Sequence, residues 1–318
     1  MGKDLIDIHL KNDEVLYGRS WTIGNPKANI IIVTGMLEHS NRYDDFARFL
    51  NQHGYDVFCF DHYGQGENVK KPGEYGVWPK SGFSKSVKNL DLVVSRLRVS
   101  CRPTYILGHS MGSFIVQDYI QRYTEHVNKV VLCGTSGKKA GVNFAYLLSR
   151  VIATKKRRNR PSPFLSKLCL GNCVTSVKNR KTDCDWLSYN ETNVEKYNVD
   201  PLCGGTASGG FYREFFKGLN RLYKRRFLKK IRDDISILII GGAQDPVGEM
   251  SKGPKKLYNL YKTIGIKSVD LIIYPHMRHE ILNETDHEIV YQDILKFFSE
   301  DTGVAEQMLA QEKEDAEK

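Results

Sequence analysis

The stretch Tyr105-Ile106-Leu107-Gly108-His109-Ser110-Met111-Gly112 joins an apolar run to a G-x-S-x-G pattern. A strand that turns sharply into a helix places the middle serine in a strained, exposed position, and the flanking glycines keep Cβ atoms out of the turn. Residues 114–116 and 119–120 are apolar at the spacing of a buried helix face. The stretch therefore predicts a strand, a tight turn at Ser110, and a helix whose first N–H groups point at the space above the serine.

Short apolar runs recur along the chain with helical patterns between them. The runs are residues 30–33, 55–60, 104–107, 129–133, 235–240 and 269–274. The helical patterns cover residues 42–53, 85–100, 111–124, 253–264 and 287–299. Such nearly continuous runs suit strands that are buried on both faces. The alternation predicts an α/β fold, with a mostly parallel sheet covered by helices on both faces.

Two further segments bear on the organisation of the domain. Residues 15–17 and 20–23 are expected to form an antiparallel hairpin at the sheet edge. The β/α alternation stops over residues 138–234, which we interpret as a helical cap inserted over the carboxyl edge of the sheet, where open α/β sheets bind ligands. The predicted division is a core of residues 1–137 and 235–302, this cap, and a polar tail of residues 303–318.

The positive charge of the chain is concentrated in the cap. The net charge is +10, yet residues 139–232 alone hold 21 Lys+Arg against 6 Asp+Glu. The densest parts are residues 155–160 and 224–230. Two interpretations are open: a solvated cationic face, or attraction to an anionic membrane surface. No nucleic-acid recognition motif accompanies the charge, so we expect no specific nucleic-acid partner.

Composition and the N-terminal sequence bear on the cellular compartment. The chain has 318 residues, of which 41% are hydrophobic and 11% aromatic, as in globular proteins. No secretory signal, myristoylation pattern or run of about 18 apolar residues is present, so we expect a cytoplasmic protein, with peripheral membrane contact as the open alternative. Seven cysteines without a signal indicate free thiols. A metal site built from Cys169, Cys173, Cys184 and Cys203 is disfavoured, since no paired C-x-x-C is present.

Two polar residues follow later strands of the predicted sheet. Asp245 comes shortly after residues 235–240, and His279 comes shortly after residues 269–274. Because the carboxyl ends of parallel strands meet at one edge, we expect Ser110, Asp245 and His279 to converge there. Serine needs a base to become nucleophilic, and the base needs an orienting carboxylate. The sequence therefore predicts Ser110 as nucleophile, His279 as base and Asp245 as the orienting acid.

Other histidines compete for the role of base. His276 lies three residues before His279, but His279 stands further from the strand end and just before the last helical pattern, so we favour it. His109 and His39 are interpreted as structural residues. Asp245 precedes a proline and would, taken alone, be a turn residue.

Acyl transfer also needs donors for the negatively charged oxygen of the tetrahedral intermediate. We expect one donor to be the backbone N–H of Met111, at the start of the helix after the serine. The other is expected in the loop after the first predicted buried strand, at the backbone N–H of Met36.

Five motifs in order resemble the α/β-hydrolase superfamily, and more narrowly its lysophospholipase and monoacylglycerol lipase branch (serine aminopeptidase S33, hydrolase_4). They are GMLEHSNRY (35–43), DHYGQG (61–66), GHSMG (108–112), DPVG (245–248) and RHEILNE (278–284). DWLS (185–188) and DPLCG (200–204) resemble cap motifs of bacterial members. The sequence departs from the branch at Thr34, where a histidine is usual, and at residues 67–68, where a small residue is expected after Gly66.

The resemblance implies a serine hydrolase that cleaves esters of glycerol-based lipids, a lysophospholipid or a monoacylglycerol, through an acyl-enzyme. It implies no metal and no cofactor. The change at Thr34 is expected to shift the loop that carries Met36 and to lower activity. A peptidase or small-ester esterase on the same three residues is the rival enzyme, and a non-catalytic binding protein of this fold is the rival from another class.

Overall fold

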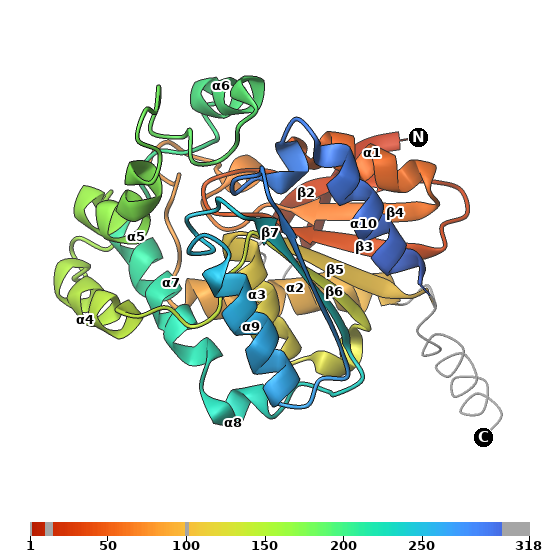
Figure 1. The fold of residues 1–318 in the computed structure, drawn as a ribbon. Helices are drawn as coiled ribbons and strands as arrows, with labels where there is room; N and C mark the ends of the chain where they lie inside the picture. The colour runs from red at the N-terminus through yellow and green to blue at the C-terminus, as the bar shows by residue number, and fades with distance from the viewer. Residues whose placement is uncertain (1, 10–14, 99–101, 301–318) are drawn as a thin grey trace.

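The computed structural model describes residues 2–9, 15–98 and 102–300 (Figure 1). An eight-stranded sheet forms the centre, with spatial order β1-β2-β4-β3-β5-β6-β7-β8. Its strands are β1 Gly2–His9, β2 Val15–Thr22, β3 Ala28–Val33, β4 Tyr55–Phe60, β5 Thr104–His109, β6 Lys129–Cys133, β7 Ser236–Gly242 and β8 Ser268–Tyr274. β2 pairs antiparallel with both β1 and β4, and the strands from β4 to β8 in this order run parallel. The predicted α/β class is confirmed.

Helices cover both faces of the sheet because successive strand residues point to opposite sides. Ile30 and Ile32 of β3 pack in one apolar cluster with α1 (Asp44–Gln52) and α10 (His287–Ser299). Ile31 and Val33 pack in the other cluster with α2 (Gly82–Arg98), α3 (Met111–Ile120) and α9 (Lys252–Thr263). The middle of β3 is therefore apolar on both of its faces.

The expected hairpin at residues 15–23 is wrong. The segment is one continuous strand, β2, which pairs with β1 on one side and β4 on the other. Gly18 is not a turn residue but a close-contact residue, since a Cβ there would lie 2.3 Å from the carbonyl oxygen of Cys59. A glycine inside a strand can mark close approach of another backbone.

Between β6 and β7 the chain forms helices instead of strands. They are α4 Val142–Ile152, α5 Pro163–Thr175, α6 Glu191–Val199, α7 Gly209–Leu222 and α8 Arg225–Leu228. In Figure 1, α4, α5 and α6 lie to one side of the sheet. α7 buries Phe211, Phe215 and Phe216 in the same cluster as α2 and α3. We call residues 138–234 the cap segment, and its boundaries remain a prediction.

Two findings bear on compartment and cysteine chemistry. Among the described residues, no helix combines the length and apolar character that crossing a membrane requires. Six cysteines in the described part of the chain are free, with Cys59 and Cys133 buried inside the sheet. The predicted tail, residues 303–318, lies outside the described residues.

Candidate active site

Ser110 occupies the turn between β5 and α3. Its backbone has φ 51° and ψ −119°, a conformation that costs energy for a residue with a side chain and is typical of a strained nucleophile turn. Gly112 permits this turn, because a Cβ there would lie 2.0 Å from the carbonyl oxygen of Val33. The sequence thus places Ser110, half-buried, at the carboxyl edge of the sheet.

The structure brings Ser110, His279 and Asp245 together in series. His279 Nε2 lies 2.8 Å from Ser110 Oγ, and His279 Nδ1 lies 3.0 Å from Asp245 Oδ1. Asp245 and His279 are each 1% exposed. The competing His276 is exposed, and no hydrogen bond joins it to Ser110 or Asp245 in the described structure. This geometry suits proton transfer from the serine to the imidazole.

Asp245 is held as a carboxylate. Burial by itself raises the pKa of Asp245, but the neighbouring charge and hydrogen bond of His279 outweigh burial and lower that pKa. The backbone N–H of Val247 also donates to Asp245 Oδ1 at 2.8 Å. A buried carboxylate in this position orients the imidazole and stabilises its protonated form.

Two backbone N–H groups are free to bind a negatively charged oxygen. Met36 and Met111 both line the same cavity as Ser110. Neither backbone N–H donates a hydrogen bond to another described residue. Free donors on the serine side of a cavity are what an oxyanion site requires.

The loop that carries Met36 is anchored by a buried carboxylate, Glu38. Glu38 Oε1 accepts hydrogen bonds from the backbone N–H of Gly35, from Tyr43 Oη at 2.7 Å and from His109 Nδ1 at 3.3 Å. Burial alone raises the pKa of Glu38, but the hydrogen bonds and charges of His109 and Arg42 lower it far below its ordinary value. Glu38 is therefore a structural anion beneath the candidate oxyanion loop.

Arg42 connects this loop to the histidine loop. Its guanidinium donates to both carboxylate oxygens of Glu280 at 2.6 and 2.8 Å, and to Glu38 Oε2 at 3.0 Å. It also donates to Asn193 of α6 at 2.9 Å. Burial alone would lower the pKa of Arg42, but the two carboxylates raise it well above its ordinary value. The sequence alone does not reveal these roles, although Glu38, Arg42 and Glu280 all lie in the motifs at residues 35–43 and 278–284.

The cap segment also holds the loop of His279. Arg278 Nη1 donates to the carbonyl oxygen of Asp185 at 2.6 Å, and the backbone N–H of Glu280 donates to the carbonyl oxygen of Leu187 at 2.7 Å. The Trp186 ring lies 5.1 Å from the His279 ring, centroid to centroid. Residues 185–188, singled out by resemblance, therefore position the candidate base.

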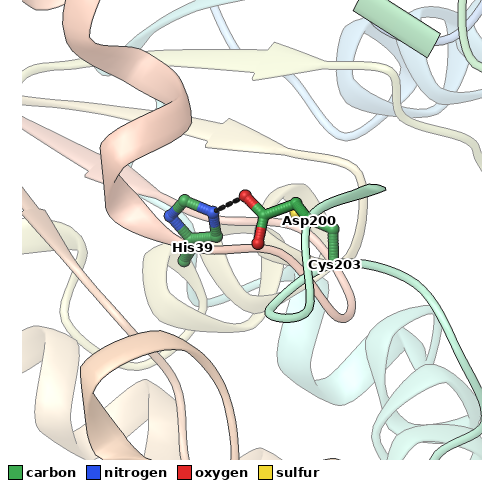
Figure 2. A group of neighbouring side chains, drawn as sticks. All are labelled: His39, Asp200 and Cys203. Atoms are coloured by element: carbon green, nitrogen blue, oxygen red, sulfur yellow. Dashed lines mark hydrogen bonds and ion pairs between the residues drawn. The ribbon is translucent and has the colours of Figure 1, made fainter. Parts of the chain in front are cut away.

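His39, Asp200 and Cys203 form a group with the donor atoms of a metal site, all within 4.8 Å of one another (Figure 2). His39 Nε2 lies 2.8 Å from Asp200 Oδ2. Burial raises the pKa of the Cys203 thiol, which disfavours the thiolate that binds metals. The contacts present are those of an imidazole–carboxylate pair that ties the candidate oxyanion loop to the cap segment. The backbone N–H of Gly204 reinforces this tie by donating to the carbonyl oxygen of Leu37 at 2.8 Å.

The cavity above Ser110 has a volume of about 410 Å³. Side chains of the cap segment supply much of its apolar wall. They include Phe144, Ala145, Leu168, Phe215, Phe216 and Leu219. Thr34, the departure noted in the sequence, is fully buried beside this loop, and its hydroxyl has no partner among the described residues. Its carbonyl oxygen lies 3.2 Å from His62 Nε2, and burial lowers the pKa of His62 to about 4.

The fold and the arrangement around Ser110 define an α/β-hydrolase. The chain belongs to the serine aminopeptidase S33 family (Hydrolase_4), whose model matches residues 24–286. Human monoglyceride lipase is 29% identical over 309 residues, covering 93% of this chain and 91% of the relative. Monoacylglycerol lipase of Mycolicibacterium smegmatis is 24% identical over 271 residues, covering 85% and 87%.

Solved structures agree with this fold. A thermostable carboxyl esterase from Bacillus coagulans, in complex with glycerol, superposes with a TM-score of 0.86 at 24% identity, covering 94% of this chain and 98% of that chain. The monoacylglycerol lipase of Paleococcus ferrophilus superposes with a TM-score of 0.64 at 23% identity, covering 88% and 97%. The family and its named relatives place this chain among the carboxylic ester hydrolases.

Proposed function

We propose that this protein hydrolyses carboxylic esters of glycerol-based lipids through an acyl-enzyme on Ser110. His279 takes the proton of Ser110 as the hydroxyl attacks the ester carbonyl, and Asp245 stabilises the imidazolium. His279 then gives this proton to the leaving alcohol. Water, deprotonated by His279, attacks the acyl-enzyme and releases the acid. The observation that carries the proposal is the 2.8 Å contact between His279 Nε2 and Ser110 Oγ.

The backbone N–H groups of Met36 and Met111 are proposed to bind the oxyanion of both tetrahedral intermediates. Such donors act only where negative charge develops, so they stabilise the transition state more than the substrate. The loss of one donor raises the barrier by about 3 kcal/mol in comparable enzymes. Each proton transfer is assigned to Ser110, His279, the leaving alcohol or water, and the proposal needs no metal or cofactor.

A lipid substrate is supported by the lining of the cavity and by the names of the relatives. An acyl chain gains about 0.8 kcal/mol for each CH₂ that it buries in an apolar wall. A peptidase or small-ester esterase on the same residues is the rival. A panel of monoacylglycerols, lysophospholipids, short-chain esters and aminoacyl amides separates them, and fastest turnover of an amide would overturn the lipid proposal.

Exposed apolar and cationic side chains of the cap segment support contact with an anionic membrane. Phe144 and Val151 of α4 and Phe164 of α5 are exposed by 65%, 73% and 57%. The exposed cations Lys155, Lys156, Arg157 and Arg160 follow α4 and precede α5 in the chain. Apolar side chains beside cations suit a lipid surface, where each cation contributes about 1 kcal/mol. Salt-sensitive binding to phosphatidylglycerol vesicles is expected, and no binding at low salt would refute this part of the proposal.

The decisive experiment is labelling with a fluorophosphonate, which reacts with activated serines. The wild type and Ser95→Ala, a change on the exposed face of α2, are expected to be labelled and active. Ser110→Ala is expected to fold normally but to lose both labelling and turnover, since triad mutants lose about 10⁶-fold in rate. An unlabelled wild type would favour a binding protein without catalysis, and an active Ser110→Ala variant would exclude Ser110 as the nucleophile.

A further inference from the structure

Lys139 is the only Lys or Arg among the described residues that line the cavity above Ser110. It follows β6 and precedes α4, and it is half-buried. No hydrogen bond or ion pair joins its ammonium to another described residue. A positive charge that is partly withdrawn from water and lacks a fixed counter-ion favours an anionic ligand.

The acidic residues of the cavity wall already have partners. Glu38 and Glu280 bind Arg42, and Glu249 lies 2.8 Å from Lys256. The first turn of α4 contains no acidic side chain. The charge of Lys139 is therefore the one charge in the described cavity wall without a direct partner.

The cavity wall that contains Lys139 also contains Ser110 and His279 of the candidate triad, and Cys169 and Cys173 of α5. Burial raises the pKa of Asp245, and the charge and hydrogen bond of His279 lower it. The positive charge of Lys139 also lowers that pKa, by less than His279 does. It is also felt at Cys169 and Cys173 of α5, although burial dominates there and raises the pKa of each thiol to about 12. Ser110, Lys139 and the apolar side chains of the cap segment thus line one cavity of about 410 Å³, which an ester bound at Ser110 would share.

We propose that Lys139 binds the phosphate of the substrate headgroup, so that the enzyme prefers a lysophospholipid to an uncharged monoacylglycerol. This inference rests on the proposed function and deepens it. The ammonium provides charge-assisted hydrogen bonds to phosphate oxygens, and the apolar wall strengthens the attraction by excluding water. A monoacylglycerol offers only hydroxyl groups at the same place and leaves the positive charge without a counter-ion.

The test compares kcat/KM for lysophosphatidylglycerol and a monoacylglycerol of the same acyl chain, both below their critical micelle concentrations. In Lys139→Gln the ratio of the two values is expected to fall about tenfold, mainly through a higher KM for the phospholipid, as for the loss of one charge-assisted hydrogen bond. Lys139→Arg is expected to keep most of the preference. The matched control is Lys138→Gln, since Lys138 is adjacent but exposed and outside the cavity wall, and its ratio should equal that of the wild type.

If Lys139 acted only through Asp245, its loss would change kcat/KM by the same factor for both substrates and would shift the pH profile of kcat/KM. An unchanged ratio in Lys139→Gln therefore overturns the proposal. Inhibition by inorganic phosphate tests whether the site binds a free anion instead of a lipid headgroup. If phosphate inhibits hydrolysis of both lipids to the same extent, and only when Lys139 is present, the site belongs to a free anion and not to a headgroup.

A binding measurement separates failure of this inference from failure of the proposed function. The probe is an ether analogue of lysophosphatidylglycerol, which has no ester to cleave, and the protein is Ser110→Ala. Binding about tenfold weaker in Ser110→Ala/Lys139→Gln supports the phosphate site, even if the wild type fails to hydrolyse lipid esters. Equal binding by the two proteins refutes the phosphate site, whatever the wild type hydrolyses.

Discussion

Arg42 donates to both carboxylate oxygens of Glu280, the residue that follows His279, at 2.6 and 2.8 Å. The two residues are 238 positions apart in sequence. The same guanidinium binds Glu38, which anchors the loop of Met36. One buried cation, Arg42, therefore binds both the candidate oxyanion loop and the loop of the candidate base, and it fixes the position of each loop relative to the other.

Arg42→Met is expected to lower the free energy of unfolding by about 3–5 kcal/mol, because it leaves two buried carboxylates without their main counter-ion. Urea denaturation measures the change. The control is Arg48→Met in α1, the helix that follows Arg42 in the chain; its ion pair with Asp44 is partly exposed and is expected to contribute less than about 1 kcal/mol. A similar loss of unfolding free energy in the two variants would contradict the role of Arg42 in holding the two loops together.

The pair of Glu38 and His109 predicts a pH-dependent stability. Burial alone would lower the pKa of His109, but the hydrogen bond and charge of Glu38 raise it, while the pKa of Glu38 is lowered. The stabilisation from His109 is complete below its unfolded pKa of about 6.5 and is lost as pH rises through its higher folded pKa. That from Glu38 is complete above about pH 4.3 and is lost as pH falls through its lower folded pKa.

His109→Gln should therefore destabilise the protein most between about pH 4.5 and 6.5, and progressively less toward pH 9. Urea denaturation of both proteins at pH 5.5, 7 and 9 measures the difference. A difference that is constant from pH 5.5 to 9 would show that the ion pair contributes nothing to folding.

Thr34→Val is expected to raise the free energy of unfolding by about 1 kcal/mol, because it removes a buried hydroxyl that has no partner in the described structure. Thr135→Val is the contrasting variant, since Thr135 Oγ1 accepts hydrogen bonds from Ser113 at 2.8 Å and from Gln117 at 3.0 Å. That change is expected to cost about 1–3 kcal/mol. Destabilisation of both variants to the same degree would indicate that the Thr34 hydroxyl is satisfied by a water molecule.

Asp200→Ala is expected to reduce kcat/KM about tenfold with a small effect on stability. It removes the carboxylate that binds His39, three residues after Met36, so the oxyanion donor is held less firmly. Asp183→Ala is the control, because Asp183 is an exposed residue of the same segment. A chelator is expected to leave wild-type activity unchanged, and a loss of activity that zinc restores would instead assign a metal to His39, Asp200 and Cys203.

Most of the fold could be predicted because its signals are local. Residues 55–60 and 129–133 were expected as strands and are strands with those bounds, and residues 287–299 form the expected helix. The wrong prediction was the hairpin at residues 15–23. Gly18 is compatible with a turn in sequence, and only the neighbouring strand β4 explains why this position lacks a side chain.

In the candidate site, too, one part could be predicted from the sequence and another part could not. Order along the chain and the shared sheet edge were enough to predict that Ser110, Asp245 and His279 meet. The partners of Glu38, Arg42 and Glu280 could not be predicted, because a charged residue in a motif can equally face solvent.

The sequence by itself determined where strands and helices alternate and which three side chains stand at strand ends, since apolar periodicity and strand order depend only on neighbours in the chain. The tertiary structure alone decided which charges are neutralised: Arg42 between Glu38 and Glu280, His39 against Asp200, and Lys139 without a direct partner in the cavity wall. Electrostatic attraction depends on distance in space and on exclusion of water, and both are set only when loops distant in sequence pack together.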